Sequence, residues 1–591
     1  MSLETKRIKE LFGYARTLTK EQGVGVMAGR AVGFFKRRCF GKKARYLPSK
    51  QTLDAQRADA AANAAGWPTI SILTPLYNTP PQFLQQLLDS VQAQTAPNWQ
   101  LVLVDASDDA HADVGRAVQA RAAQDSRIVY AKIKNAGIAA NTNEAAKLAT
   151  GDYLALADHD DMLAPHAVYC MSKALAESGV PFAYSDEALF EKTPEHPRVG
   201  HFKPDYAPEY LMAVNYICHL AVFKKSLFDA VGGERPACDG AQDHDLFLRL
   251  VDEMQRSDPA AKPLHIPQVL YYWRVHAAST SGGTAAKPYV EQAAQRAVAD
   301  HLAATGRQGR VEAGLFPGTC HVVWDIPEPE PLVSILIPNK DHTDDLEKCL
   351  HSIYAKTTYE SFEVIVIENN STDPATEAYY QTIPGRFARC RVVRYKGAFN
   401  FSAINNFGAQ FADGEHLLLL NNDIEVLSHD FLRELLSYSQ RPDVGAVGAK
   451  LYYPDDTIQH AGVLMGINGS AGHSHKSYPR TAVGDMYRLV TTQDYMAVTG
   501  ACLMTKTALY RANGGLDEEK FAVAYNDVDY CLKLWKRGLL NVYTPRAEAY
   551  HYESKSRGLD TLSENAKRYE REKANFYAKY QQYIDNYDPY Y

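Results

Sequence analysis

The chain has 591 residues, of which 46% are hydrophobic and 23% are charged, and its formal net charge is −7. This length is too great for one hydrophobic core, so we expect two to four domains, and the composition excludes a globally disordered chain. The nine cysteines are scattered and form no Cys-x-x-Cys pair, which argues against a disulfide framework and a thiolate zinc site.

The N-terminal segment is a basic arm. Residues 1–50 hold 13 Lys or Arg against three Glu, and Ile8, Leu11 and Phe12 fall at helical spacing among them. Such an arm can lie on an anionic membrane surface, and docking on the acidic remainder of the chain or on a partner explains it equally well. No apolar run approaches the roughly 18 residues that cross a bilayer, and the start lacks the features of a signal peptide, so we expect a cytoplasmic protein.

Two apolar runs follow, and an amphipathic segment separates them. Residues 69–75 end in proline and predict a buried first strand, while residues 101–105 predict a second strand that ends in a carboxylate. Phe83, Leu87 and Val91 form the apolar stripe of a helix between them. This order predicts a mostly parallel, Rossmann-like α/β sheet covered by helices, with ligands at the carboxyl ends of the strands.

The same pattern recurs 263 residues later. Residues 69–75 match 332–338, residues 101–105 match 364–368, residues 151–152 match 414–415, and residues 158–160 match 421–423. Four landmarks in one register are not expected by chance, so we predict a tandem duplication of one α/β unit.

Proline-rich residues 325–331 separate the two halves and predict a stiff spacer. We therefore expect a basic helical extension over residues 1–65, a first domain over 66–325 and a second domain over 326–591. After residue 560 the second domain becomes a Tyr- and Lys-rich helical tail, for which packing is the expected role.

Acidic residues directly after a buried strand are candidate metal ligands in each half. Asp158 and Asp160 can hold Mg²⁺ or Mn²⁺ against a diphosphate, although such a pair taken alone is more often a turn or a helix cap. In the second half, Asn421 and Asn422 precede a single carboxylate, Asp423. We therefore expect the second site to bind metal with weaker charge or to use another ligand.

A second acidic pair opens an amphipathic helix in each half. Asp243 and Asp527 can point into the cleft at the strand ends and take the proton from an attacking sugar hydroxyl. Asp245 and Asp529, two residues further on, are interpreted as helix caps.

One histidine lies among aromatic residues near the end of each half, His276 in the first and His551 in the second. Neutral imidazole is a common metal ligand, but a lone histidine in such surroundings is more often a core residue, so the repeat carries this prediction. His473 and His475, in a Gly-rich segment, resemble a fragment of a metal site, but we interpret the segment as a flexible loop over the second cleft.

In these residues the chain resembles the family 2 glycosyltransferases of the GT-A fold, over residues 66–320 and 331–575. The resemblance is carried by residues 400–406, 421–423 and 525–529 in the second half and by 184–187, 202–205 and 215–219 in the first. These runs look like the modules that build bacterial O-antigens and other surface polysaccharides, a rhamnosyltransferase-like group.

The resemblance implies a role for each matching position. The metal ligands would be Asp158, Asp160 and His276 in the first domain and Asp423 and His551 in the second, with Asp243 and Asp527 as the catalytic bases. The residues facing the donor would be Pro75, Tyr77, Asn78, Asp105 and Asp158 in the first domain and Pro338, Asn339, Glu368, Asn421 and Asn422 in the second. The turn after Asp105 is about one residue shorter than the family pattern, which leaves the donor open.

We therefore expect a bifunctional inverting glycosyltransferase of the hexosyltransferase class, with one Mn²⁺ or Mg²⁺ ion in each domain. Its partners would be a UDP-, dTDP- or GDP-linked sugar and a lipid-linked glycan acceptor, but no nucleic acid, and it would work in the cytoplasm or on the inner face of the bacterial cell membrane. Two alternatives stay open: a metal-dependent nucleotidyltransferase, and one active domain beside a degenerate carbohydrate-binding scaffold.

Overall fold

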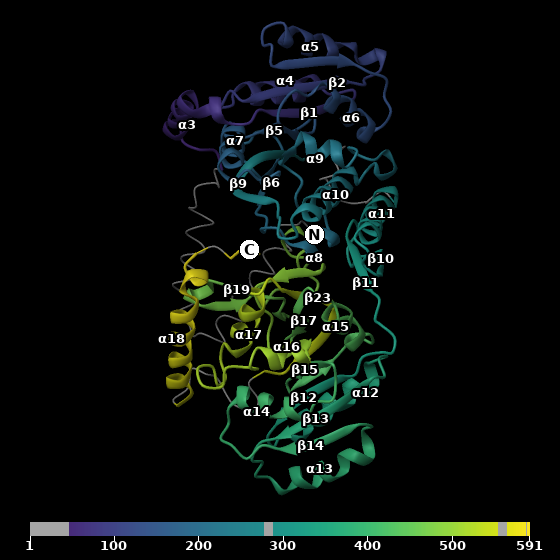
Figure 1. Cartoon of the computed structure of the whole chain (residues 1–591), viewed down its shortest axis with the longest axis vertical. Helices are drawn as coiled ribbons and strands as arrows, with labels where there is room; N and C mark the ends of the chain where they lie inside the picture. Colours follow the sequence, from purple (N-terminus) through teal and green to yellow (C-terminus); the bar gives the residue numbers. More distant parts are fainter. Residues whose placement is uncertain (1–45, 277–287, 554–563, 587) are drawn as a thin grey trace. The chain divides into compact units, whose positions relative to one another are not determined.

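The computed structural model describes residues 46–276, 288–553, 564–586 and 588–591 (Figure 1). Residues 1–45, which make up nearly all of the predicted basic arm, lie outside the described residues. The described residues form two compact units that divide between Val322 and Val323. We call them the first module, residues 46–322, and the second module, residues 323–591.

The first module is built on a nine-stranded sheet of order β3-β2-β1-β4-β8-β6-β9-β5, in which β7 also pairs with β6. Its strands are β1 (Ile70–Leu76), β2 (Trp99–Asp105), β3 (Ile128–Lys132), β4 (Tyr153–Leu156), β5 (Met162–Leu163), β6 (Phe182–Phe190), β7 (Val199–His201), β8 (Ala221–Lys224) and β9 (Leu264–Arg274). Its longer helices are α3 (Lys50–Asn63), α4 (Pro81–Gln92), α5 (Ala112–Ala122), α6 (Ile138–Leu148), α7 (Ala167–Ser178), α10 (Gln242–Ser257) and α11 (Pro288–Ala304). The strands β3, β2, β1 and β4 are parallel, and β8 runs antiparallel to β4 and β6.

Buried apolar positions explain the first elements. Nearly every residue of β1 and β2 is buried, as expected for parallel strands covered on both faces. Helix α4 begins at Pro81, where the missing N–H costs no helical hydrogen bond, and it turns Leu87 and Val91 into the core. Helix α3 packs on the same core through Ala60.

The second module repeats this arrangement with the sheet order β14-β13-β12-β15-β22-β17-β23-β16, to which β18 and β21 add at β17 and β23. Its strands are β12 (Val333–Asn339), β13 (Phe362–Glu368), β14 (Cys390–Arg394), β15 (His416–Leu420), β16 (Ile424–Val426), β17 (Val444–Tyr452), β18 (Ile458–His460), β21 (Gln493–Tyr495), β22 (Cys502–Lys506) and β23 (Leu540–His551). Its longer helices are α12 (Thr343–Lys356), α13 (Pro374–Arg386), α14 (Phe401–Gly408), α15 (Phe431–Ser439), α17 (Asn526–Trp535) and α18 (Glu564–Ile584).

Strand pairing shows the duplication directly. Ile70 lies opposite Trp99 in the first sheet, and Val333 lies opposite Phe362 in the second, so both partners differ by 263 residues between the modules. The same spacing relates the pairing of β1 with β4 to that of β12 with β15. The predicted tandem α/β fold is therefore confirmed.

The C-terminal helix α18 packs on the second module close to α17 (Figure 1). The Phe576 ring stacks on Tyr525, with ring centroids 4.6 Å apart. The Glu572 carboxylate accepts a 2.6 Å hydrogen bond from the backbone N–H of Ala524. Helix α18 thus holds the segment that leads into α17, in agreement with the packing role expected for the tail.

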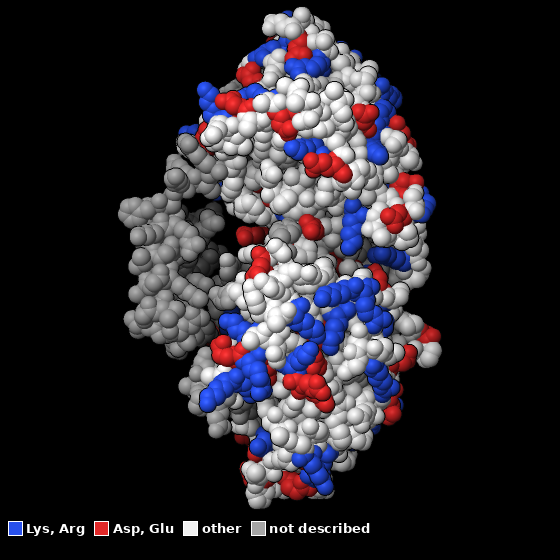
Figure 2. Space-filling model, turned by 60° about the vertical axis from the view of Figure 1, so that its left-hand side comes forward, with Lys and Arg blue, Asp and Glu red and all other residues white. Residues whose placement is uncertain are grey.

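The described helices include none that combines the length and the apolar composition needed to cross a membrane. Acidic and basic side chains are interspersed over the face shown in Figure 2. Exposed ion pairs among the described residues include Lys147 with Glu144 and Arg394 with Glu377. Exposed pairs of this kind contribute at most about 1 kcal/mol each to stability.

Candidate functional site

A cavity of about 690 Å³ opens in the second module at the carboxyl ends of β12 and β15. It collects most of the residues predicted for the second site. These are Pro338, Asn339, Asn421, Asn422, Asp423, Asp527 and His551. Glu368, at the end of β13, is not among the lining residues, and its carboxylate accepts a hydrogen bond from the backbone N–H of Ser371.

Asp423 and His551 face each other in this cavity. Asp423 Oδ1 lies 3.2 Å from His551 Nε2, and both side chains are almost fully buried. Asn421 Nδ2 is also 3.2 Å from His551 Nε2. A carboxylate oxygen and an imidazole nitrogen are common ligands of Mn²⁺ and related ions, so this pair fits a divalent cation.

Asp527 lies in the first turn of α17 and is held by backbone groups. Its Oδ2 accepts a 2.7 Å hydrogen bond from the Gly500 N–H, and its Oδ1 accepts a 2.8 Å bond from the Val528 N–H. A Cβ at position 500 would lie 3.1 Å from Asp527 Cβ, so glycine allows this close approach. The carboxylate is therefore fixed in orientation on the wall of the cavity.

The expected donor residues of the second module form a hydrogen-bonded pair. Asn422 Nδ2 donates to Asn339 Oδ1 over 2.7 Å, and Asn339 Nδ2 in turn donates to the Tyr380 hydroxyl over 2.8 Å. This chain ties the end of β12 to the loop after β15. It leaves the ends of both strands facing the cavity.

In the first module, three carboxylates gather after β4. Oxygens of Asp158, Asp160 and Asp161 lie within 4.8 Å of one another. Withdrawal from water and the neighbouring Asp160 charge raise the pKa of Asp158 to about 6. His276 Nε2 lies 2.7 Å from Asp160 Oδ2. Because a divalent cation would neutralise the repulsion between these carboxylates, the ligand set fits Mg²⁺ or Mn²⁺.

Asp161, which the sequence did not single out as a ligand, anchors this cluster. It accepts a 2.7 Å hydrogen bond from the Tyr271 hydroxyl and another of 2.7 Å from the backbone N–H of Arg274. Both partners lie on β9. Asp161 therefore fixes the loop that carries Asp158 and Asp160 against the sheet.

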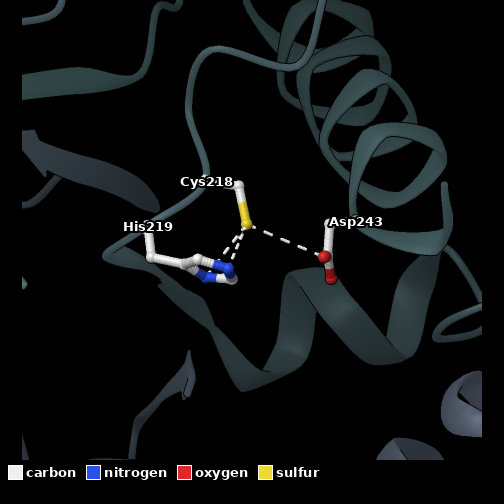
Figure 3. A group of neighbouring side chains, drawn as sticks. All are labelled: Cys218, His219 and Asp243. Atoms are coloured by element: carbon white, nitrogen blue, oxygen red, sulfur yellow. Dashed lines mark hydrogen bonds between the residues drawn. The ribbon is translucent and has the colours of Figure 1, made fainter. Parts of the chain in front are cut away.

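Asp243 lies in the first turn of α10, near Cys218 and His219 (Figure 3). The Cys218 thiol is 3.7 Å from Asp243 Oδ2, and His219 Nε2 is 3.7 Å from Asp158 Oδ2. Burial raises the pKa of Asp243. The structure thus brings the expected base and the expected metal ligands of the first module to one place.

The expected donor residues of the first module lie around the ends of β1 and β2. Pro75 is in β1, and Tyr77 just beyond it is 50% exposed. Asn78 Nδ2 donates to Asp108 Oδ2 over 3.0 Å. Burial would raise the pKa of Asp105, but hydrogen bonds from Ser107, Lys132 and Tyr130 outweigh it and lower this pKa.

The interpretation of Asp245 and Asp529 as helix caps is wrong. Neither α10 nor α17 begins with a side-chain cap, and both carboxylates are fully buried in ion pairs. Asp245 binds Arg249 at 2.6 Å, one helical turn further along. Asp529 binds Lys533 at 2.8 Å and accepts a 2.7 Å bond from Tyr580 of α18. These residues anchor the helices that carry the two candidate bases.

The two candidate metal-binding histidines are not at equivalent positions. The pairing of β5 with β9 and of β16 with β23 places His551 at the position of Trp273 in the first module, three residues before His276. Each histidine nevertheless contacts the matching aspartate, Asp160 or Asp423. The two modules therefore place a histidine beside their aspartates from different positions in the sequence.

Several residues for which we predicted no role also belong to the sites. In the second module they are Gln459, Glu553 and Lys476, which line the cavity. His473 lines it too, but it lies at the end of the short strand β20 (Ala471–His473) rather than in a loop. Their spacing from Asp423 and Asp527 follows no sequence periodicity, so only the folded chain shows them.

Comparison with known proteins agrees with this geometry. The pattern of glycosyl transferase family 2 matches residues 71–232 and 334–507, once in each module and over more than half of the chain. The family match therefore occurs twice, once in each α/β module. The chain belongs to glycosyl transferase family 2 and is a glycosyltransferase.

Two relatives match most of the chain. An uncharacterized protein of Sinorhizobium fredii is 40% identical over 88% of this chain and 57% of its own length. The O-antigen biosynthesis protein RfbC of Myxococcus xanthus is 36% identical over 86% of this chain and 39% of its own length. The chain thus spans about half or less of these relatives.

Among solved structures, a mannosyltransferase from Pyrobaculum calidifontis in complex with GDP-Man and Mn²⁺ is 18% identical. The match covers 45% of this chain and 69% of that chain, with a TM-score of 0.32.

Proposed function

We propose that the chain is a bifunctional inverting glycosyltransferase, with one transferase domain over residues 66–325 and another over 326–591. Each domain would move a sugar from a nucleotide-sugar donor to a glycan acceptor. The observation that carries this proposal is the cavity of the second module, which brings Asp423, His551 and Asp527 together at the ends of the parallel strands. Ligands of open α/β sheets bind at this edge.

In the second module, Asp527 would act as the base. As the acceptor oxygen bonds to the anomeric carbon, its proton passes to the Asp527 carboxylate, and the nucleoside diphosphate leaves with the bonding electron pair. The N–H groups of Gly500 and Val528 hold the carboxylate for this step. A base positioned in this way is worth about 10² to 10⁴ in rate.

The metal would be held by Asp423 and His551 in the second module and by Asp158, Asp160 and His276 in the first. When bound, a divalent ion stabilises negative charge on the leaving diphosphate. Asn339, Asn421 and Asn422 would orient the donor through their amide groups.

In the first module, Asp243 would take the proton. Burial raises its pKa, which brings the carboxyl closer to the working pH of a general base. Cys218 and His219 lie between this carboxyl and Asp158, so they would line the path of the acceptor.

The product class is inferred from relatives. RfbC is named as an O-antigen biosynthesis protein, and another relative, 25% identical over 39% of this chain, is an N-acetylglucosaminyl-diphospho-decaprenol L-rhamnosyltransferase of Mycobacterium tuberculosis. These names support a bacterial surface polysaccharide as the product and a lipid-linked acceptor. The donor would be a UDP-, dTDP- or GDP-linked sugar, and the reaction would take place on the cytoplasmic side of the membrane.

The test is a screen of nucleotide sugars for release of nucleoside diphosphate. The full chain is compared with Asp243→Asn and Asp527→Asn, so that each module is disabled in turn. Each variant should lose one donor activity and keep the other. Release of pyrophosphate in place of nucleoside diphosphate would instead identify a nucleotidyltransferase.

A further inference from the structure

Strand β18 carries Gln459, whose side chain would not be expected to face the second-module cavity if the strand paired regularly. Its pairing with β17 is irregular, because Leu451 lies opposite His460 and Tyr452 lies opposite Ile458. Gln459 is therefore bulged out of the ladder. Bulges re-aim side chains and recur beside active sites. Gln459 is 3% exposed and lines the cavity.

The first module has no such side chain at the corresponding place. There β6 and β7 pair in regular register, with Glu187 opposite His201 and Ala188 opposite Gly200. The residue next to the paired histidine is therefore a glycine in the first module and Gln459 in the second. The bulge and its glutamine distinguish the second site.

Hydrogen bonds at both ends fix the amide of Gln459. Its Nε2 lies 2.9 Å from Glu553 Oε2, and its Oε1 lies 2.7 Å from His551 Nδ1. The NH₂ group of Gln459 donates to the Glu553 carboxylate. The amide oxygen of Gln459 then faces His551, and an amide oxygen only accepts hydrogen bonds. His551 Nδ1 must therefore carry a proton.

In the neutral form of the ring, a proton at Nδ1 leaves a lone pair at Nε2. This nitrogen is 3.2 Å from Asn421 Nδ2, which can donate to it, and 3.2 Å from Asp423 Oδ1. The lone pairs of His551 and Asp423 both face the gap between them. A cation relieves the repulsion between two such atoms, and a hydrogen bond at the other ring nitrogen is the usual way to orient a metal-binding imidazole.

We propose that Gln459, held by Glu553, is a positioning residue of the second module that fixes His551 with Nε2 directed to the metal. The second module has Asn421 where the first has Asp158, so it carries one carboxylate fewer in the matching segment. With fewer carboxylates, the second site depends more than the first on a correctly oriented imidazole. The metal part of this inference rests on the proposed function, whereas the ring orientation does not.

The test begins with the tautomer of His551, measured at pH 8 on the full-length, metal-free chain labelled with ¹⁵N-histidine. The His551→Asn variant assigns the signals of this ring by their loss. We expect a protonated Nδ1 and an unprotonated Nε2. In Gln459→Leu the signals should shift toward a mixture of tautomers, and in Gln459→Glu, which keeps an oxygen beside Nδ1, the wild-type tautomer should persist.

Mn²⁺ binding, followed by electron paramagnetic resonance, gives a second readout. Loss of an outer hydrogen-bond partner typically weakens metal affinity about 10- to 100-fold, and we expect Gln459→Leu to do so at one of the two sites. Glu553→Gln should have a smaller effect in the same direction, because it frees the amide of Gln459 to turn. Gln381→Leu is the matched control, since Gln381 also binds a glutamate, Glu377, but on an exposed helix surface.

An unprotonated Nδ1 in the wild type, or a His551 tautomer unchanged in Gln459→Leu, would overturn the inference. A chain that shows the expected tautomer but binds no Mn²⁺ would contradict the proposed metal site. The two failures are therefore distinguishable.

Discussion

Replacing Asp527 by asparagine removes the proposed base of the second module and keeps nearly the same side-chain shape. Asparagine cannot take the acceptor proton, so kcat of this module should fall about 10²- to 10⁴-fold. This corresponds to about 2.8 to 5.6 kcal/mol in the activation free energy, at about 1.4 kcal/mol for each factor of ten. The cavity itself should remain, because none of its other lining residues changes.

The same substitution has a structural cost that must be measured separately. The carboxylate of Asp527 accepts N–H bonds from Gly500 at one oxygen and from Val528 at the other. Asparagine offers one oxygen, so one of these N–H groups loses its acceptor. An unsatisfied buried group costs about 1 to 3 kcal/mol, and position 527 is only half-buried, so we expect about 1 kcal/mol in the free energy of unfolding.

The assay is nucleoside diphosphate release in an Asp243→Asn background, which isolates the second module. Asp413→Asn is the control, because Asp413 is an exposed carboxylate of the same module. The control should keep full turnover. If Asp527→Asn also keeps its turnover to within a few-fold while remaining folded, Asp527 is not the base.

Three further predictions concern stability and metal binding. Asp529→Ala should lower the free energy of unfolding by about 3 kcal/mol, because it leaves Lys533 and Lys579 without their buried partner. An unchanged denaturation midpoint would refute the anchoring role of Asp529. Burial lowers the pKa of His416 to about 4, so stability is intact above pH 6.5 and is lost as the pH falls toward 4. At pH 5 the loss in the free energy of unfolding amounts to about 2 kcal/mol. His416→Gln should therefore reduce the difference in stability between denaturation curves at pH 7 and pH 5 by this amount. A variant whose stability depends on pH as steeply as that of the wild type would contradict the prediction. Asn421→Asp gives the second module the carboxylate that the first module has at Asp158. It should tighten Mn²⁺ binding, followed by paramagnetic resonance, on the order of tenfold. Weaker binding would show that Asn421 is not beside the ion.

The repeat could be predicted from sequence because strand burial leaves a strong signal. The apolar runs at 69–75 and 332–338 became β1 and β12, and their offset of 263 residues is the offset of the strand registers. Residues that follow directly after such strands, among them Asp158 and Asp423, could be located for the same reason. Their distance from the strand is short and nearly the same in both modules.

Residues far from a strand end could not be placed by the same reasoning. His276 and His551 were paired by their aromatic surroundings, yet His551 is the last residue of β23 whereas His276 lies two residues beyond the end of β9. Gln459 reaches His551 through a bulge, and a bulge leaves no periodic trace in the sequence. Asp245 had the position of a helix cap, but the folded chain gives it two charged partners, Arg249 in the same helix and Arg235 before the helix.

The most direct test of the account is a crystal structure of the full chain with a nucleoside diphosphate and Mn²⁺. We predict an ion bound to Asp160 and His276 in the first module and to Asp423 and His551 in the second, with the diphosphate on it and Asp243 or Asp527 across the cleft. A nucleotide bound away from Asp160 and Asp423, or an ion without contact to them, would contradict it.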